Sequence, residues 1–195
     1  MPQPRYYDLE SAMGLIDEPN QTICKRLYEE NRELIRKAQG SRANHQAWEG
    51  GYIDHITETM NLAICCYGVL SVARSLPFSL SDSLLALSLH DIEKPWKQAG
   101  KVEGLEIGGV KKRSAIKDFR NELIKKYGFE LTDEHRNAIE YAEGEIDEYS
   151  PTQRMQGPLA AFVHACDVLS ARMWPEHPTA DPWNGAVRSS LVKKS

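Results

Sequence analysis

The sequence contains few of the residues that typify secreted, disulfide-rich proteins. Its 195 residues include only four cysteines, which show neither CxxC spacing nor the density of a disulfide framework. Cys65 and Cys66 lie within the apolar segment LAICCYGVL, where cysteine behaves as a small hydrophobe. The sequence therefore predicts buried thiols at these positions.

Signals for export or membrane insertion are also scarce. The first twenty residues lack a basic start followed by an apolar run, so no signal peptide is predicted. No stretch comes close to the roughly 20 consecutive apolar residues that cross a bilayer. We therefore expect a cytoplasmic protein without a membrane partner. The sequence leaves the oligomeric state open, with a homo-oligomer among the alternatives.

The net charge is −4, so the overall excess of basic residues found in most nucleic-acid binders is missing. Nucleic acid is accordingly not expected as a partner. One segment departs from the average, because residues 111–126 carry seven basic side chains against Asp118 and Glu122. Two interpretations stay open for this segment: a solvated helix face, or a positive field that attracts a phosphate-bearing substrate.

The patterns present are those of helices. Apolar and charged residues make up 41% and 27% of the chain, a normal globular balance. Ser81 and Thr132 are predicted N-caps, and Pro95 is expected to stop the helix that begins at Ser81. The predicted helices cover residues 21–38, 51–73, 81 to just before 95, 111–127, 133–145 and 157–173. We therefore predict an all-α bundle of five to six or more helices in one domain (1–195), with its core at about 45–173 and an irregular tail at 174–195.

The strongest local signal for chemistry is the segment LLALSLHDIEKPW, in which His90 and Asp91 follow an apolar run. On a helix, Leu84 and Leu87 would lie on the same side as Asp91. An ionised carboxylate is costly there unless a cation or strong donors compensate it. A metal ion would satisfy both side chains. A histidine–aspartate pair at a helix C-terminus is also a common structural device, so the pair alone does not establish a metal site.

Three ordered segments extend this pattern: HQAWEGGYIDHIT (45–57), HDIEK (90–94) and HACDVLSAR (164–172). Together they resemble the HD-domain phosphohydrolase superfamily, in which a histidine, an adjacent His-Asp pair and a later aspartate bind metal. The resemblance implies an HD-like helical bundle. It implies these metal ligands: His55, His90, Asp91 and Asp167. Two imidazoles and two carboxylates suit one divalent ion, namely Mn, Fe, Mg, Zn or Ni.

The resemblance further implies a metal-dependent phosphohydrolase that cleaves a phosphoester or phosphoanhydride of a small nucleotide-type substrate with activated water. Asp91 is the expected catalytic contact to metal and water, and Lys94 is expected to neutralise phosphate charge. Trp48, His135 and Glu143 are further candidates for substrate binding. Each has a structural alternative: a core aromatic for Trp48, and surface positions on a polar helix for the other two.

Two other functions remain open at this point. Motifs with paired glycines like Gly50 and Gly51 also occur in HD proteins that resemble RNA exonucleases, which would make this chain a nucleic-acid-processing module. The acidic net charge argues against that interpretation. The other alternative is a non-catalytic nucleotide sensor, against which the complete set of four ligands argues.

Overall fold

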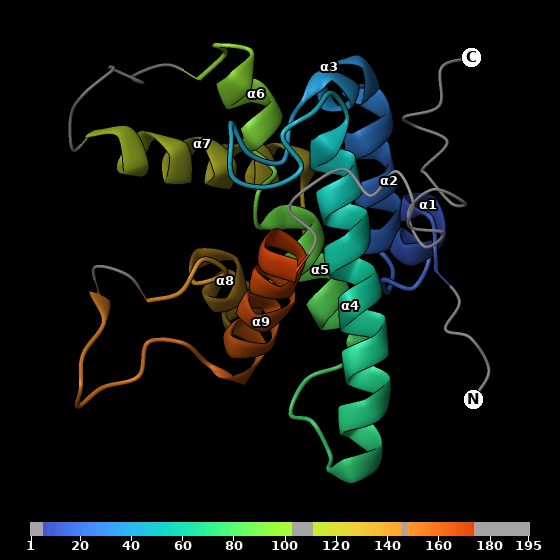
Figure 1. Ribbon diagram of the computed structural model, residues 1–195, viewed down its shortest axis with the longest axis vertical. Coiled ribbons are helices and arrows are strands. Elements are labelled where there is room, and N and C mark those ends of the chain that lie inside the picture. The colour runs from blue at the N-terminus through green and yellow to red at the C-terminus, as the bar shows by residue number, and fades with distance from the viewer. Residues whose placement is uncertain (1–5, 103–110, 146–147, 174–195) are drawn as a thin grey trace.

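The computed structural model describes residues 6–102, 111–145 and 148–173, with only the backbone described for 111–113. Within these ranges all regular elements are helices and none is a strand, which confirms the predicted fold class (Figure 1). The helices are α1 (Leu9–Met13), α2 (Asn20–Glu30), α3 (Arg32–Lys37), α4 (Gly51–Ala73), α5 (Leu80–Leu89), α6 (Lys94–Gln98), α7 (Lys111–Tyr127), α8 (Asp133–Glu140) and α9 (Pro158–Met173). The tail predicted as irregular, 174–195, lies outside the described residues.

The long helix α4 is the centre of the packing. It contacts α1, α3, α5 and α9, and α8 packs against both α5 and α9 (Figure 1). Ile53 and Ile56 of α4 and Leu84 and Leu87 of α5 are fully buried in one hydrophobic cluster. The faces of α4, α5 and α9 are therefore held against one another, so polar residues placed on these faces must meet inside the bundle.

Helix α5 begins and ends at other residues than the sequence predicts. Ser79, not Ser81, is the N-cap, because its side chain accepts from the Asp82 backbone N–H while Asp82 bonds back to the Ser79 N–H. The helix ends at Leu89, and Pro95 lies in the first turn of α6. Proline starts a helix there because a first-turn residue has no intrahelical use for its N–H.

Two further predicted helices are shorter in the structure. The helix predicted over 21–38 is interrupted at Asn31, whose side chain donates to the Leu27 carbonyl and to the Tyr127 hydroxyl, both at 2.7 Å. The helix predicted over 133–145 has its expected N-cap, Thr132, but ends at Glu140. At Asn31 the side chain shares the Leu27 carbonyl with the backbone N–H of the same residue, and after Glu140 a turn bond from the Gly144 N–H to the Tyr141 carbonyl follows.

Helix α4 is long and apolar enough to span a bilayer by length and composition alone, a property that was not predicted from the sequence. Between Gly51 and Ala63 it is buried almost throughout by the surrounding helices. Farther on, Val69 and Val72 are 72% and 89% exposed. A core helix meets the same two criteria as a membrane span, so they carry little weight for this helix.

Candidate metal centre

Two adjacent glycines determine where α4 begins. Gly50 is the N-cap and has φ of 82°, in the left-handed region that favours glycine. Gly51 passes so close to the preceding loop that a Cβ there would lie 1.9 Å from the Gln46 carbonyl oxygen. The loop and the first turn of α4 are thus locked together, which directs His55 into the bundle, where it is fully buried.

We expect Gly51→Ala to lower the free energy of unfolding by about 2 kcal/mol or more, because the added methyl cannot fit without a backbone shift. Gly68→Ala is the matched control on the same helix, since a Cβ there meets nothing within 4 Å. It should raise the free energy of unfolding by roughly 0.5–1 kcal/mol through helix propensity. Urea denaturation followed by circular dichroism measures both. Shifts of the same sign would contradict the proposed close contact.

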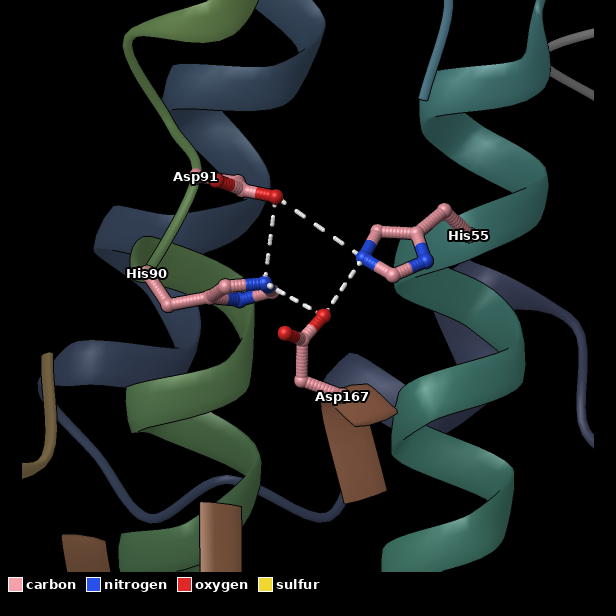
Figure 2. Close-up of side chains that lie close together, drawn as sticks. All are labelled: His55, His90, Asp91 and Asp167. Carbon is pink, nitrogen blue, oxygen red and sulfur yellow. Dashed lines mark ion pairs between the residues drawn. The ribbon is translucent and has the colours of Figure 1, made fainter. Parts of the chain in front are cut away.

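Four side chains from separate parts of the chain converge beside α4 (Figure 2). His55 comes from α4, His90 and Asp91 from the end of α5, and Asp167 from α9. His55 Nε2 lies 3.0 Å from an Asp167 oxygen, and His90 Nε2 lies 3.2 Å from an Asp91 oxygen. One potential ligand atom from each residue lies within 4.8 Å of all the others. The structure therefore brings together the four residues implied by the sequence motifs in a group that could hold a metal ion.

The hydrogen bond at the far side of His90 determines which ring nitrogen faces the cluster. His90 Nδ1 lies 2.8 Å from the Leu87 carbonyl oxygen, which can only accept a hydrogen bond. Nδ1 therefore carries the proton. Nε2 is directed at the carboxylates of Asp91 and Asp167 and has no hydrogen bond of good geometry. This arrangement leaves a nitrogen lone pair available to a cation.

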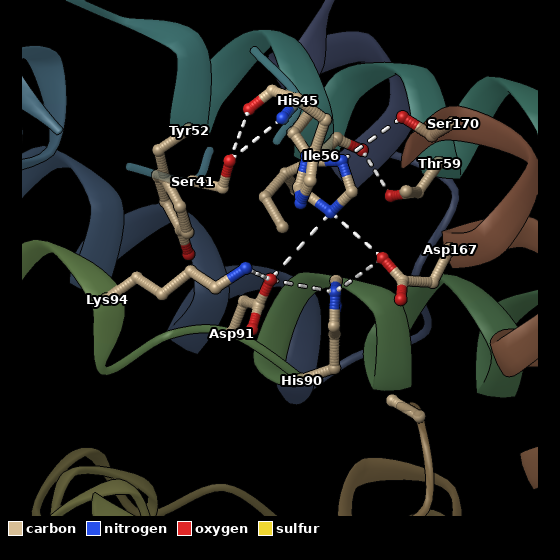
Figure 3. A network of polar contacts seen from close by, with 12 residues as sticks. Ser41, His45, Tyr52, Ile56, Thr59, His90, Asp91, Lys94, Asp167 and Ser170 are labelled. Carbon is tan, nitrogen blue, oxygen red and sulfur yellow. Dashed lines mark hydrogen bonds and ion pairs between the residues drawn. The ribbon is translucent and has the colours of Figure 1, made fainter. Parts of the chain in front are cut away.

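His55 is oriented by a longer relay, which runs through Ser170 (Figure 3) and leads on to a buried carboxylate. Ser170 Oγ donates to Glu58 Oε2 at 2.6 Å, and Gln46 Nε2 also donates to that oxygen at 3.0 Å. Since the single hydroxyl proton of Ser170 is used on Glu58, its oxygen must accept from His55 Nδ1, 3.1 Å away. His55 Nε2 is then the unprotonated nitrogen, and it too lies in the cluster without a hydrogen-bond partner.

The cluster concentrates charge where water has little access. Burial raises the pKa of Asp167, but the adjacent imidazoles of His55 and His90 more than reverse this and hold it below its usual range. Burial lowers the pKa of His90, whereas the adjacent carboxylates of Asp91 and Asp167 raise it to about 10. Burial dominates at His55, whose pKa is lowered. Without a metal, one protonated histidine and the Lys94 ammonium thus balance the two carboxylates.

The donor set fits a divalent metal ion. Two Nε2 atoms are buried and unpartnered, and two carboxylates face them from Asp91 and Asp167. Mixed nitrogen and oxygen ligands of this kind suit Mn²⁺, Fe²⁺, Zn²⁺ or Ni²⁺, and a five- or six-coordinate ion would keep positions open for other ligands. A bound cation would take over the compensating role of the proton on His90 and of the Lys94 ammonium.

Ser170→Ala should weaken metal binding by about 10–100-fold, because the relay partner that holds the His55 tautomer is lost. Ser83→Ala is the control, since Ser83 is equally buried but donates to the carbonyls of Ser79 and Leu80 at the start of its own helix, away from the cluster. Competition with a metal-sensing dye measures both affinities without any assay of activity. An unchanged affinity in the Ser170 variant would show that the relay does not orient His55.

A cavity of about 240 Å³ opens beside the cluster. His90 and Asp91 line it, and Lys94 follows one turn after Asp91 with its ammonium in an ion pair with that carboxylate (Figure 3). The other charged lining residues are Glu93, Lys97, Lys117, Arg120, Glu140, Glu143, Glu145 and Glu148. Carboxylates outnumber ammonium and guanidinium groups in this lining, so a metal ion would be needed to make the cavity attractive to a phosphate.

Among the α7 side chains that the structure describes, the basic residues Lys117 and Arg120 reach this cavity. Both are held by Glu140 of α8: Lys117 in a close ion pair and Arg120 with its NH2 at 3.2 Å. Arg120 also donates to the carbonyl oxygen of His90 at 2.9 Å. The basic helix therefore does contribute two cations beside the cluster, although both are already partnered by a carboxylate.

Glu93 was not predicted from the sequence as a site residue. It lines the same cavity, is only 5% exposed, and its Oε2 has no hydrogen-bond partner. Burial and the nearby charge of Asp91 raise the pKa of Glu93 to about 7. Glu58 and Ser170 were also missed. The only signal for them in the sequence is their position, one helical turn after His55 and Asp167 respectively.

The three candidate substrate contacts lie in different places. Glu143 lines the cavity beside the cluster, as expected of a substrate contact. Trp48 is outside the lining, and its indole N–H donates to Asp54 at 2.7 Å. His135 is also outside the lining, because its Nδ1 accepts from the Thr132 N–H and its Nε2 pairs with Asp82 at 3.0 Å. These bonds give His135 a structural role at the start of α8.

Comparisons of the chain with protein families, with curated proteins and with solved structures found no match.

Proposed function

We propose that this protein is a metal-dependent phosphohydrolase of the HD type that acts on a small phosphorylated substrate of the nucleotide class. The observation that carries the proposal is the convergence of His55, His90, Asp91 and Asp167 with both Nε2 atoms unpartnered. The order and spacing of the sequence motifs, which resemble those of the HD superfamily, support it. The cavity beside the cluster provides room for the substrate.

A divalent ion in this cluster would supply Lewis-acid activation of water and polarisation of the phosphorus centre. Asp91 contributes an acceptor for the water proton at the mouth of the cluster, since its carboxylate lies between the histidines and Lys94. Lys94 contributes positive charge on the cavity side, where it would stabilise the developing charge on the phosphate. Lys117 and Arg120 add charge farther along the same wall.

The depth of the site supports hydrolysis of a small substrate. His55, His90 and Asp91 are at most 4% exposed, so the reacting phosphate would be removed from bulk water when bound. A cavity of about 240 Å³ is large enough for a phosphate and part of the group it is attached to. The base and sugar of a nucleotide would then extend beyond the cavity.

The direct test combines metal analysis with a phosphate-release screen. Purified protein is loaded separately with Mn²⁺, Fe²⁺, Mg²⁺, Zn²⁺ and Ni²⁺, its metal content is measured, and each form is incubated with nucleoside mono-, di- and triphosphates and cyclic nucleotides. We expect about one bound ion per chain and phosphate release from at least one substrate. Metal binding without any release would favour a nucleotide sensor or a nucleic-acid module instead.

A further inference from the structure

A second and larger cavity, of about 720 Å³, lies between α7 and α8. None of the four cluster residues lines it. It shares four lining residues with the cavity beside the cluster, namely Arg120, Ile139, Glu140 and Tyr141. The two cavities are therefore neighbours, with the ion pair between Arg120 and Glu140 in their common wall.

The charges around this second cavity differ from those near the cluster. Its lining includes Arg120, Lys125 and Arg136, while Glu140 is its only carboxylate among the described residues. Glu140 is already engaged by Lys117 and Arg120. No ion pair or hydrogen bond within the described part of the chain involves the side chains of Lys125 or Arg136, which line the cavity from two different helices.

The buried guanidinium group of Arg120 is a second, independent indication that this cavity holds a ligand. Its side chain is only 9% exposed, two of its nitrogens are hydrogen bonded, and its Nε is buried without a partner. A buried donor of a guanidinium group is costly to leave unpaired. An acceptor supplied by a ligand would satisfy it, and an anionic acceptor would be bound most strongly.

We propose that the cavity between α7 and α8 binds an anionic group of phosphate chemistry, held by Arg120, Lys125 and Arg136. Arginine matches phosphate oxygens with its fixed fork of donors, and lysine adds a mobile point charge. The apolar side chains of Ile124 and Leu131 reduce the contact of this charge with water and so strengthen it. This anion site goes beyond the hydrolytic function and does not require it.

The test titrates inorganic pyrophosphate into metal-free protein by calorimetry. The double variant Lys125→Ala/Arg136→Ala should bind it at least tenfold more weakly than the wild type. Glu140→Gln should bind it several-fold more tightly, because a carboxylate that competes for Arg120 becomes neutral. Lys126→Ala is the matched control, since this lysine lies over the Tyr127 ring on the same helix and does not line the cavity.

Equal affinity in the wild type and the double variant would overturn the proposal, as would the lack of any binding to the wild type. Circular dichroism establishes that the variants are folded. A second measurement distinguishes the two sources of the anion. If the double variant has a raised KM for substrates with a second anionic group, but not for monoanionic esters, the bound anion is part of the substrate. If the double variant binds pyrophosphate more weakly but has an unchanged KM for every substrate, the site binds an anion separate from the substrate. The calorimetric result stands even if no hydrolysis is found.

Discussion

Asp91→Asn is expected to lower kcat for phosphate release by at least about a hundredfold, the scale of removing a key electrostatic group from an active site. Asparagine keeps the shape of the side chain but removes a charge that faces His55, His90 and Lys94. Both metal affinity and the activation of water depend on that charge. The fold should survive, because the amide oxygen can still accept a hydrogen bond from the Lys94 ammonium.

The measurement is a single assay of metal-loaded wild type and variant on the best substrate of the nucleotide screen. Asp118→Asn is the control, because it makes the same chemical change on the exposed surface of α7. It should leave kcat within about twofold, as expected for a surface substitution. Equal rates in the wild type and the Asp91 variant would mean that the observed hydrolysis comes from a contaminant.

Saturation with the preferred metal ion should raise the melting temperature by roughly 8–16 °C. An ion present at a thousand times its dissociation constant stabilises the folded state by about 4 kcal/mol if it does not bind the unfolded chain. For a chain of this size, each kcal/mol shifts the melting temperature by about 2–4 °C. The cluster joins α4, α5 and α9, so the bound ion would resist their separation directly.

Thermal melts with and without chelator measure this increment in melting temperature on metal binding. In Asp167→Asn the increment should fall to less than about half of its wild-type value, because one charged ligand is lost. The comparison uses the difference between the two melts of each protein, so a change in the stability of the metal-free variant does not affect it. A large increment preserved in this variant would place the metal elsewhere.

Much of the fold is readable in the sequence because its signals are local. The boundaries predicted for α4 match the structure, since Gly50 and Gly51 begin it and the apolar pattern continues to Ala73. Thr132 as the N-cap of α8 and the end of α7 at Tyr127 also follow from neighbouring residues. One error in the predicted helix boundaries arises because a nearby polar residue offers an equivalent cap, as with Ser81 and Ser79.

The candidate site was also readable in part. An aspartate close behind an apolar run is costly without a partner, and this local pattern singled out His90 and Asp91 without establishing a metal site. His55 and Asp167 were added through the resemblance of their motifs. The sequence could not assign roles to Trp48 and His135, because their hydrogen bonds to Asp54 and Asp82 depend on the packing of loops and helices.

The sequence by itself determined the helical class and the position of α4, because these depend on periodicity and capping, and the resemblance of its short motifs indicated four residues that could hold a metal ion. Only the tertiary structure decided how these residues meet. The bond from His55 to Ser170 joins residues 115 positions apart, and that from Arg120 to the His90 carbonyl joins residues 30 apart. The direction of the His90 imidazole follows from a local bond to Leu87, but that of His55 depends on a bond between distant segments, which exists only once the helices have packed.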